Sequence, residues 1–523
     1  MNYIQAKAYC AQLRLADQID PDELVESMMD QLICISWESQ DTRYQTTRLS
    51  AAYVELFGKG LEKMTRARDW MLFIPFLANY YVKTMQWIET VLVEKSIPEW
   101  NQIILLFTHN CLDFIQFLNT KTVSESLVDF PYDSHDIGKE SGDVKRRYLA
   151  FYLIHLVCEK IMAHLDMGLS KAYFDKCHVA YNTSNLMAHQ PKKSNNQEDY
   201  LLFSIIQRCT KFVVDTGLSF EKLHQLRASL KSIEVNDKSE EDIMMENDRQ
   251  MINARLYSLG SNGIAVLFSL SLYDELIASK KYGLLPNNLN AFSVSKTYIG
   301  MLLNLVFRPS DLICQTDKGI FVMLYLADHI KPTLTMDDLD KDIQGPSGEI
   351  PVAQIIQVLS SVASTCPDKS IRFCSYKLIE KFLKFCTDEP RFLLLAELIE
   401  RCPFPSMNTA AIGLLKDQVS SSFQEKTFSM FASPLILSRF FPIIFKFKSD
   451  WKMNGNVFWD DYNHVMQALN FYYFLLNLDR RLNVTTVWNQ DQRGYIKKDY
   501  LNPLESLLNT ISTEVYMNMT YES

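Results

Sequence analysis

The sequence predicts an all-α protein built as an irregular, HEAT-like helical repeat, also called an α-solenoid. Glycine and proline are scarce, with 16 and 17 in 523 residues, too few for the tight turns of an all-β protein of this size. Apolar residues recur three and four positions apart almost throughout, and no convincing run of alternating strand residues occurs. At this length we expect two or more domains or one elongated repeat array.

Helical spacing is clear in four segments of the first two thirds of the chain. The apolar residues of 49–57 and 104–118 follow the spacing of an amphipathic helix. The segments 149–162 and 201–214 predict further helices that are apolar on more than one face. Such helices lie inside a helical stack, where neighbours cover them on both sides.

Three polar segments interrupt this pattern: 184–200, 236–249 and 331–351. We expect solvated loops there, because clusters of charge without apolar periodicity rarely pack. The third segment joins a cluster of aspartates to glycine and proline and is the expected boundary. The predicted organisation is a helical repeat region over 1–330, an acidic Gly- and Pro-containing linker over 331–351, and a HEAT-like region over 352–523.

The region after Pro351 predicts a series of short helices. One covers Ile355–Val362, and Asp368 opens the next. Asp388–Pro390 begins a third helix, and Cys402–Pro405 separates it from a fourth. Repeated restarts at Asp or Pro are typical of helical-hairpin solenoids.

A solenoid of this kind presents a ridge of exposed side chains that suits a protein partner. The expected ridge residues are Arg372, Lys377, Arg391, Arg401, Lys416 and Asp417. A second candidate surface is the segment Phe440–Trp459, where aromatic and lysine residues alternate, although we expect most of its aromatic residues in the core. The selected partner-binding candidates are Arg391, Arg401, Lys416, Asp417, Lys448 and Trp451.

Composition and patterning argue against nucleic acid, membrane and secretion. The formal net charge is -9, and no Lys/Arg stripe forms a basic face for a duplex. The segment Leu256–Tyr273 is uncharged but is interrupted by Gly260–Gly263, which we expect to be a turn between helices. Met1–Asp20 is not a signal peptide, and the 11 cysteines contain no Cys-x-x-Cys pair, so we expect a protein of the cytoplasm or nucleus with reduced thiols.

No arrangement of residues predicts catalysis, a metal or a cofactor, and we expect a protein that is not an enzyme. Phe57–Gly60 lacks the remaining residues of a P-loop. His155 and Cys158 lie three apart on one helix without two further zinc ligands. Asp460 and His464 could serve acid–base chemistry, but an aspartate N-cap with an exposed histidine explains them better.

Two parts of the sequence resemble the glomulin/YAP-binding protein family. The first is Ile371–Gln418, and the second is the tail with VMQALNFYYFLLNLD at Val465–Asp479 and YLNPLESLLNTI at Tyr500–Ile511. In that family a late helix with a Leu-Asn pair, here Leu469 and Asn470, precedes a Leu-x-Pro-Leu element. The resemblance covers the last third of the chain well and the rest in general helical character.

The resemblance implies a non-catalytic helical protein that regulates a protein partner. Glomulin covers the RING subunit of cullin–RING ubiquitin ligases and blocks the ubiquitin-conjugating enzyme. The fungal YAP-binding branch supports a bZIP transcription factor of the oxidative-stress response, and some of its members are linked to kinetochores. RING-subunit binding is our first hypothesis, with the bZIP cofactor and a helical structural scaffold as alternatives that the residues leave open.

Overall fold

Helices make up nearly all of the part of the chain that the computed structural model describes. The described residues are 100–120, 152–179, 197–215, 261–278, 291–307, 312–329, 333–345, 348–424, 429–453 and 455–521. The fold class is therefore confirmed as an all-α helical repeat, to which one short β-hairpin is added. The helix predicted over 49–57 and the loop predicted over 236–249 lie outside these residues.

The chain divides into two units. One comprises the residues up to 290 together with 314–322, and the other comprises 291–313 and 323–523. The helix α13 (Ile313–His329) contributes residues to both. The described elements of the N-terminal unit besides α13 are α5 (Trp100–Thr120), the π-helix η1 (Tyr152–Ile161), the 3-10 helix η2 (Met162–His164), α7 (Leu169–Val179), α8 (Gln197–Asp215) and α11 (Ser261–Ala278).

The N-terminal unit has a core of helices that are covered on several faces. The helix α11 packs against η1, η2 and α8, and α5 packs against α8 and η1. Residues 263–272 of α11 are all buried, as expected for a helix inside a stack. The segment predicted as a helix over 149–162 is π-helical in its described part, and α8 begins at Gln197, inside the segment predicted as a loop over 184–200.

A buried pair of charged residues on α13 holds the start of α7. The Asp317 carboxylate accepts hydrogen bonds from Leu169 N at 2.7 Å, Ser170 N at 3.0 Å and Ser170 Oγ at 2.5 Å. The Lys318 ammonium donates to Leu165 O at 2.7 Å and Cys314 O at 3.1 Å. Burial lowers the pKa of Lys318, and the neighbouring Asp317 opposes that shift. The pair thus satisfies backbone amides and a carbonyl that precede and begin α7.

Gly263 lies inside α11, not in the turn expected over Gly260–Gly263, and it allows η1 to approach closely. A Cβ added there would lie 2.4 Å from Ile154 O and 2.7 Å from Ile154 Cγ2. We expect Gly263→Ala to lower the free energy of unfolding by about 1–3 kcal/mol, since overpacking outweighs the helix propensity of alanine. In Gly413→Ala of α18, where no atom lies within 4 Å of the new Cβ, thermal denaturation should show equal or higher stability. Equal midpoints for the two variants would contradict this packing argument.

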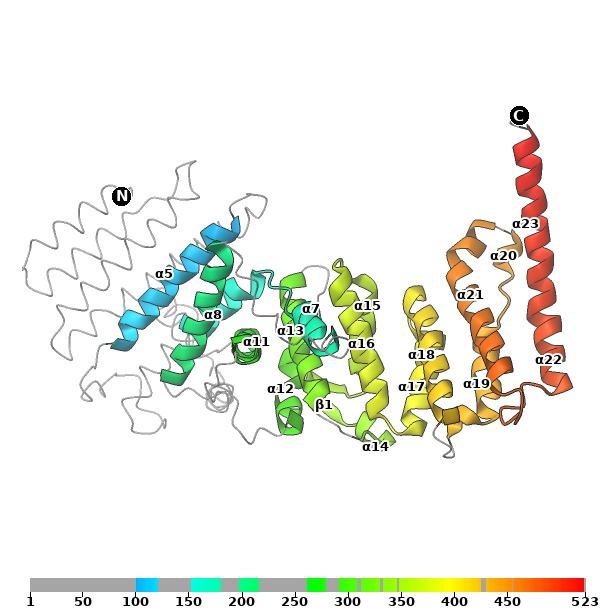
Figure 1. The fold of residues 1–523 in the computed structure, drawn as a ribbon, viewed down its shortest axis with the longest axis horizontal. Coiled ribbons are helices and arrows are strands. Elements are labelled where there is room, and N and C mark those ends of the chain that lie inside the picture. Colours follow the sequence, from blue (N-terminus) through cyan, green and yellow to red (C-terminus); the bar gives the residue numbers. More distant parts are fainter. Residues whose placement is uncertain are drawn as a thin grey trace, which may run out of the picture. The chain divides into compact units, whose positions relative to one another are not determined.

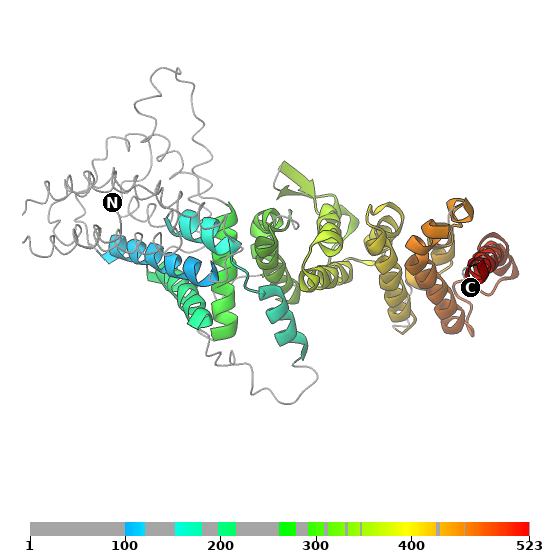
Figure 2. The same cartoon turned by 90° about the horizontal axis from the view of Figure 1, so that it is seen from above.

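The C-terminal unit is a succession of helices that stand side by side in both views (Figures 1 and 2). Its elements besides α13 are α12 (Ala291–Val306), α14 (Met336–Leu339), β1 (Asp342–Gly345), β2 (Gly348–Pro351), α15 (Gln354–Thr365), α16 (Lys369–Phe385), α17 (Asp388–Arg401), α18 (Pro405–Gln424), the 3-10 helix η3 (Met430–Ala432), α19 (Leu435–Ile444), α20 (Asp450–Met453), α21 (Gly455–Leu478), α22 (Gln490–Ile496), the π-helix η4 (Lys497–Leu501) and α23 (Asn502–Tyr521). The helix α15 packs on α16, α17 on α18, and α18 on α21.

The helices α15 to α18 occupy the positions that the sequence predicts. Asp368 caps α16, with its Oδ1 accepting from Ser370 N at 2.7 Å and Ile371 N at 2.9 Å. Pro405 is the first residue of α18, a position where the missing N–H of proline costs no hydrogen bond. Each restart of the chain turns it back against the preceding helix, which is how a solenoid grows.

The segment expected as a linker over 331–351 contains α14 and the β-hairpin. The strands β1 and β2 pair antiparallel, with Asp342 opposite Pro351 and Gly345 opposite Gly348. The hairpin packs on α12 and α15, and α14 packs on α17. These elements fall within the C-terminal unit. The domain boundary predicted at 331–351 therefore remains a proposal, which limited proteolysis would test.

Candidate functional site

A groove in the C-terminal unit is the best candidate site. It has a volume of about 930 Å³ and is lined mainly by α18, α19 and α21, with contributions from α16 and α17. Its apolar lining includes Tyr376, Ile399, Pro442, Ile443 and Met466. Its polar lining includes Asn408, Asn463, Gln467, Glu400, Lys446, Lys448, Asp460, Asp461 and His464. This mixture suits a peptide or protein surface.

Asp461 organises one wall of the groove. Its Oδ2 accepts hydrogen bonds from Lys448 Nζ at 2.8 Å and from Trp451 Nε1 at 2.9 Å. Burial alone would raise the pKa of Asp461, but these two hydrogen bonds, together with the charge of Lys448 and the proximity of His464, outweigh burial and lower it. The carboxylate is therefore ionised at neutral pH and ties Lys448 and the helix α20 to α21. Asp460 and Asp461 lie inside α21, so the expectation that one of them is a helix N-cap is wrong.

His464 is also part of this wall and is half-buried, whereas the sequence suggested an exposed histidine. Its Nε2 lies 3.3 Å from Ile444 O and donates to it. Burial lowers the pKa of His464; the Ile444 hydrogen bond and Asp461 act in the opposite direction, and Lys448 lowers it further. The imidazole is thus neutral at pH 7 and has a structural hydrogen bond, which explains its position without catalysis.

The lowered pKa of His464 makes the stability of this wall depend on pH. Its pKa in the folded state lies below the ordinary value of 6.5, so below that pH the unfolded chain binds the proton more readily. The contribution is fully present above pH 6.5 and is lost as the pH falls. Thermal denaturation between pH 7 and pH 5 should therefore show a smaller loss of stability for His464→Gln than for the wild type. Identical pH dependence would exclude His464 as the cause.

The structure places two of the predicted partner-binding residues in structural roles. Trp451 is only 1% exposed, packed edge-on against Phe447 and Phe458, so it is a core residue and not a surface anchor. Arg391 donates through Nε to Leu383 O at 2.8 Å and through its terminal nitrogens to Cys386 O at 2.6 Å and Gln418 Oε1 at 3.1 Å. It therefore closes the end of α16 and joins it to α18.

The other four candidates lie at or near the surface. Arg401 and Asp417 are exposed. Lys416 is half-buried, with its Nζ 4.9 Å from the centre of the Phe474 ring. Lys448 is exposed and lines the groove. Whether these four contact a partner remains a prediction.

An exposed aromatic face lies on α21; the second candidate surface predicted from the sequence, Phe440–Trp459, ends at its first residue, and Tyr462 and Met466 were not predicted. Trp459 is 54% exposed, its ring centroid lies 5.6 Å from that of Tyr462, and Met466 is exposed on the next turn. These three residues lie three and four positions apart and so share one face of the helix beside the groove. The spacing was visible in the sequence. The same spacing also fits a buried face, so exposure could not be inferred from it.

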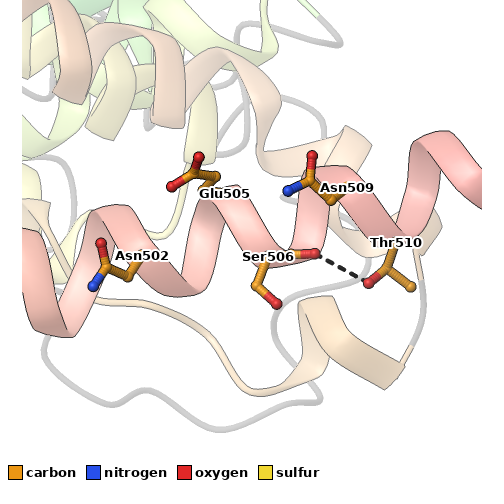
Figure 3. Close-up of a pocket in the computed structure, with 5 residues that line it drawn as sticks. All are labelled: Asn502, Glu505, Ser506, Asn509 and Thr510. Carbon is orange, nitrogen blue, oxygen red and sulfur yellow. Dashed lines mark hydrogen bonds between the residues drawn. The ribbon is translucent and has the colours of Figure 1, made fainter.

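A second depression, of about 440 Å³, lies along α23 (Figure 3). All of its lining comes from one helix: Asn502, Glu505, Ser506, Asn509 and Thr510. Thr510 Oγ1 donates to Ser506 O at 3.0 Å, as is usual for a hydroxyl within a helix. A polar face of a single helix encloses nothing, so we do not treat it as a site.

Within the described ranges, no helix is long and apolar enough to cross a membrane. Nor do the described residues bring three or more His, Cys, Asp or Glu side chains together as metal ligands. Cys158 is fully buried beside Cys209, and burial raises the pKa of its thiol. Burial likewise raises the pKa of Cys386 to about 12, so these thiols are unreactive at neutral pH.

Comparison with known proteins supports the resemblance found in the C-terminal third. Residues 122–521 match a family described as "Uncharacterised protein family, YAP/Alf4/glomulin". No curated protein matches the sequence significantly. The matched range covers more than half of the chain and every described element of the C-terminal unit. The family is not a known family of enzymes, and membership in it supports a protein-binding regulator. The chain belongs to the YAP/Alf4/glomulin family.

Proposed function

We propose that this chain binds the RING subunit of a cullin–RING ubiquitin ligase and inhibits ubiquitin transfer. The observation that carries the proposal is the exposed aromatic face of α21 beside the groove, in a unit whose described residues all lie within the family match. Trp459, Tyr462 and Met466 are of the residue types that are enriched at the centres of protein interfaces.

Inhibition of this kind needs no chemistry. A RING domain holds its conjugating enzyme through a small surface and with low affinity. A rigid helical face that buries an interface of roughly 1,600 Å² would compete effectively for that surface. Pre-formed helices also lose little conformational entropy on binding, so more of the contact energy appears as affinity.

Binding of the purified full chain to a cullin–RING-subunit complex tests the proposal. We expect submicromolar affinity for the wild type and a loss of at least about tenfold for Trp459→Ala combined with Tyr462→Ala, since aromatic anchors carry much of the energy of an interface. Leu508→Ala is the matched control, because Leu508 is also an exposed apolar residue of this unit but lies on α23. Absence of wild-type binding at micromolar concentration would overturn the proposal.

The bZIP cofactor is the alternative to which that negative result would lead. Burial raises the pKa of Cys158 and Cys386, so neither of these two thiols is suited to react with peroxide in that alternative. A structural scaffold would instead require two separable surfaces. Binding of every partner by the C-terminal unit's surface alone would argue against the scaffold.

A further inference from the structure

The turn that follows α21 is held unusually firmly by side chains. The Asp479 carboxylate is fully buried and accepts three hydrogen bonds: Val484 N to Oδ1 at 2.9 Å, and Thr485 N and Oγ1 to Oδ2 at 2.7 and 2.6 Å. Asp479 also ends the helix, because its N donates to Leu475 O while its own carbonyl accepts from Asn483 N. One aspartate thus fixes both ends of the segment 480–484, which we name the Leu482 turn.

Asn483 and Trp488 anchor the far side of this turn. Asn483 Oδ1 accepts from Trp488 N at 3.0 Å, and its Nδ2 donates to Asn489 Oδ1 at 2.9 Å. Trp488 Nε1 in turn donates to Leu476 O at 3.1 Å, which returns the chain to the last turns of α21. The turn is therefore closed by side-chain hydrogen bonds on both sides and keeps a defined shape.

The backbone is strained at one residue within this turn and at one residue two positions beyond it. Asn483 has φ 49° and Thr486 has φ 66°, in the left-handed region that favours glycine. Threonine is β-branched, and such residues rarely adopt this conformation. Strain of this kind persists only where surrounding interactions impose it, and it concentrates at sites that bind or switch.

The Leu482 turn displays two arginines and an exposed leucine. Leu482 is 77% exposed, and Arg480 and Arg481 are exposed beside it. Within the described part of the chain, neither guanidinium forms an ion pair, whereas Arg439 pairs with Glu400 at 2.8 Å. The turn thus presents an aliphatic side chain directly after two arginines that form no ion pair within the described residues. Exposing this leucine to solvent contributes nothing to the stability of the isolated chain.

We propose that the Leu482 turn is a second contact with the protein partner, and that it inserts Leu482 into an aliphatic socket bordered by carboxylates. The inference rests on the proposed function for the identity of that partner. Arginine suits this role because its planar fork donates two parallel hydrogen bonds to a carboxylate. Pre-organisation by Asp479 and Asn483 reduces the entropy lost on docking.

A protein surface fits the turn better than a membrane or a nucleic acid does. A single myristoyl chain, with far more apolar surface than one leucine, gives only marginal membrane binding. Nucleic acid carries closely spaced phosphates. Because the formal net charge of the chain is -9, the rest of the protein would repel these phosphates. A protein can supply both a socket for Leu482 and a few well-placed carboxylates.

The test measures affinity of full-length variants for a purified cullin–RING-subunit complex. Leu482→Asp, and separately Arg480→Glu with Arg481→Glu, should each weaken binding by at least about tenfold, since each removes an anchor or reverses its charge. Lys497→Glu with Lys498→Glu is the control of equal charge change, because both lysines are exposed in the same unit. Thermal denaturation of each variant verifies folding, which we expect to be unchanged at these exposed positions.

The outcomes separate this inference from the proposed function. If the wild type binds and the turn variants bind equally well, the inference is wrong while the proposed function stands. If the lysine control loses as much affinity as the arginine variant, the effect is general electrostatics and the turn is not a specific contact. If the wild type does not bind, both proposals fail. If the chain sediments with vesicles of phosphatidylcholine and phosphatidylserine, and Leu482→Asp abolishes this, the turn binds a membrane and the proposed protein socket is wrong.

Discussion

Replacing Asp317 by alanine is expected to lower the free energy of unfolding of the N-terminal unit by about 3–5 kcal/mol. Asp317 is 3% exposed and holds two backbone amides and a hydroxyl at the start of α7. Its loss leaves those amides unpaired and leaves the fully buried ammonium of Lys318 without the neighbouring carboxylate. Removing one partner of a buried pair costs far more than the intact pair contributes.

Hydrogen exchange is the suitable measurement for Asp317→Ala, because a chain of 523 residues need not unfold in one step. We expect faster exchange of the amides in α7 and α13, and a lower urea midpoint for that region. Asp175→Ala is the control, since Asp175 is an exposed aspartate on α7. Protection of α7 that equals the control's would show that the Asp317 hydrogen bonds contribute little to folding.

Asp479→Ala is expected to have the second largest effect, about 2–4 kcal/mol on the C-terminal unit. The substitution removes three hydrogen bonds to a buried carboxylate and leaves the Thr485 N–H without its acceptor. The strained backbone of Asn483 and Thr486 then has less to hold it, so the turn should also become mobile.

Thermal denaturation and hydrogen exchange of residues 480–489 would measure both consequences for Asp479→Ala. Asp499→Ala serves as the control, because Asp499 is an exposed aspartate in η4 of the same unit. Asp479→Asn should be intermediate, since the amide retains one acceptor oxygen of the two. A melting temperature and exchange rates that match the Asp499→Ala control would contradict the role of Asp479.

Local signals in the sequence predicted the helices α15 to α18 well. Asp368 precedes an apolar-periodic run and does cap α16, and Pro405 begins α18 as proline at a first helical position should. These boundaries depend on residues within a few positions of one another. The short hairpin was missed because β1 and β2 have four residues each, too few for an alternating pattern to be recognised.

Contacts between distant residues could not be predicted in this way. The hydrogen bond from Leu169 N to the Asp317 carboxylate joins residues 148 positions apart. No residue near Asp317 in the sequence indicates that this side chain caps another helix. The aromatic and lysine residues of Phe440–Trp459 indicate an amphipathic segment, but the sequence does not show which of its side chains face the core. Trp451 was therefore predicted as a partner-binding residue, although it is buried. Asp479 stood within the segment that carries the family resemblance, but its role depends on the turn that follows.

The most direct test of the central claim is reconstituted ubiquitin chain synthesis by a cullin–RING ligase, titrated with the purified full chain at low and high concentrations of conjugating enzyme. We predict complete inhibition, with a half-inhibitory concentration that rises with the conjugating enzyme, because the two proteins compete for one surface of the RING subunit. Chain synthesis that continues unchanged at saturating amounts of the protein would contradict the proposed function.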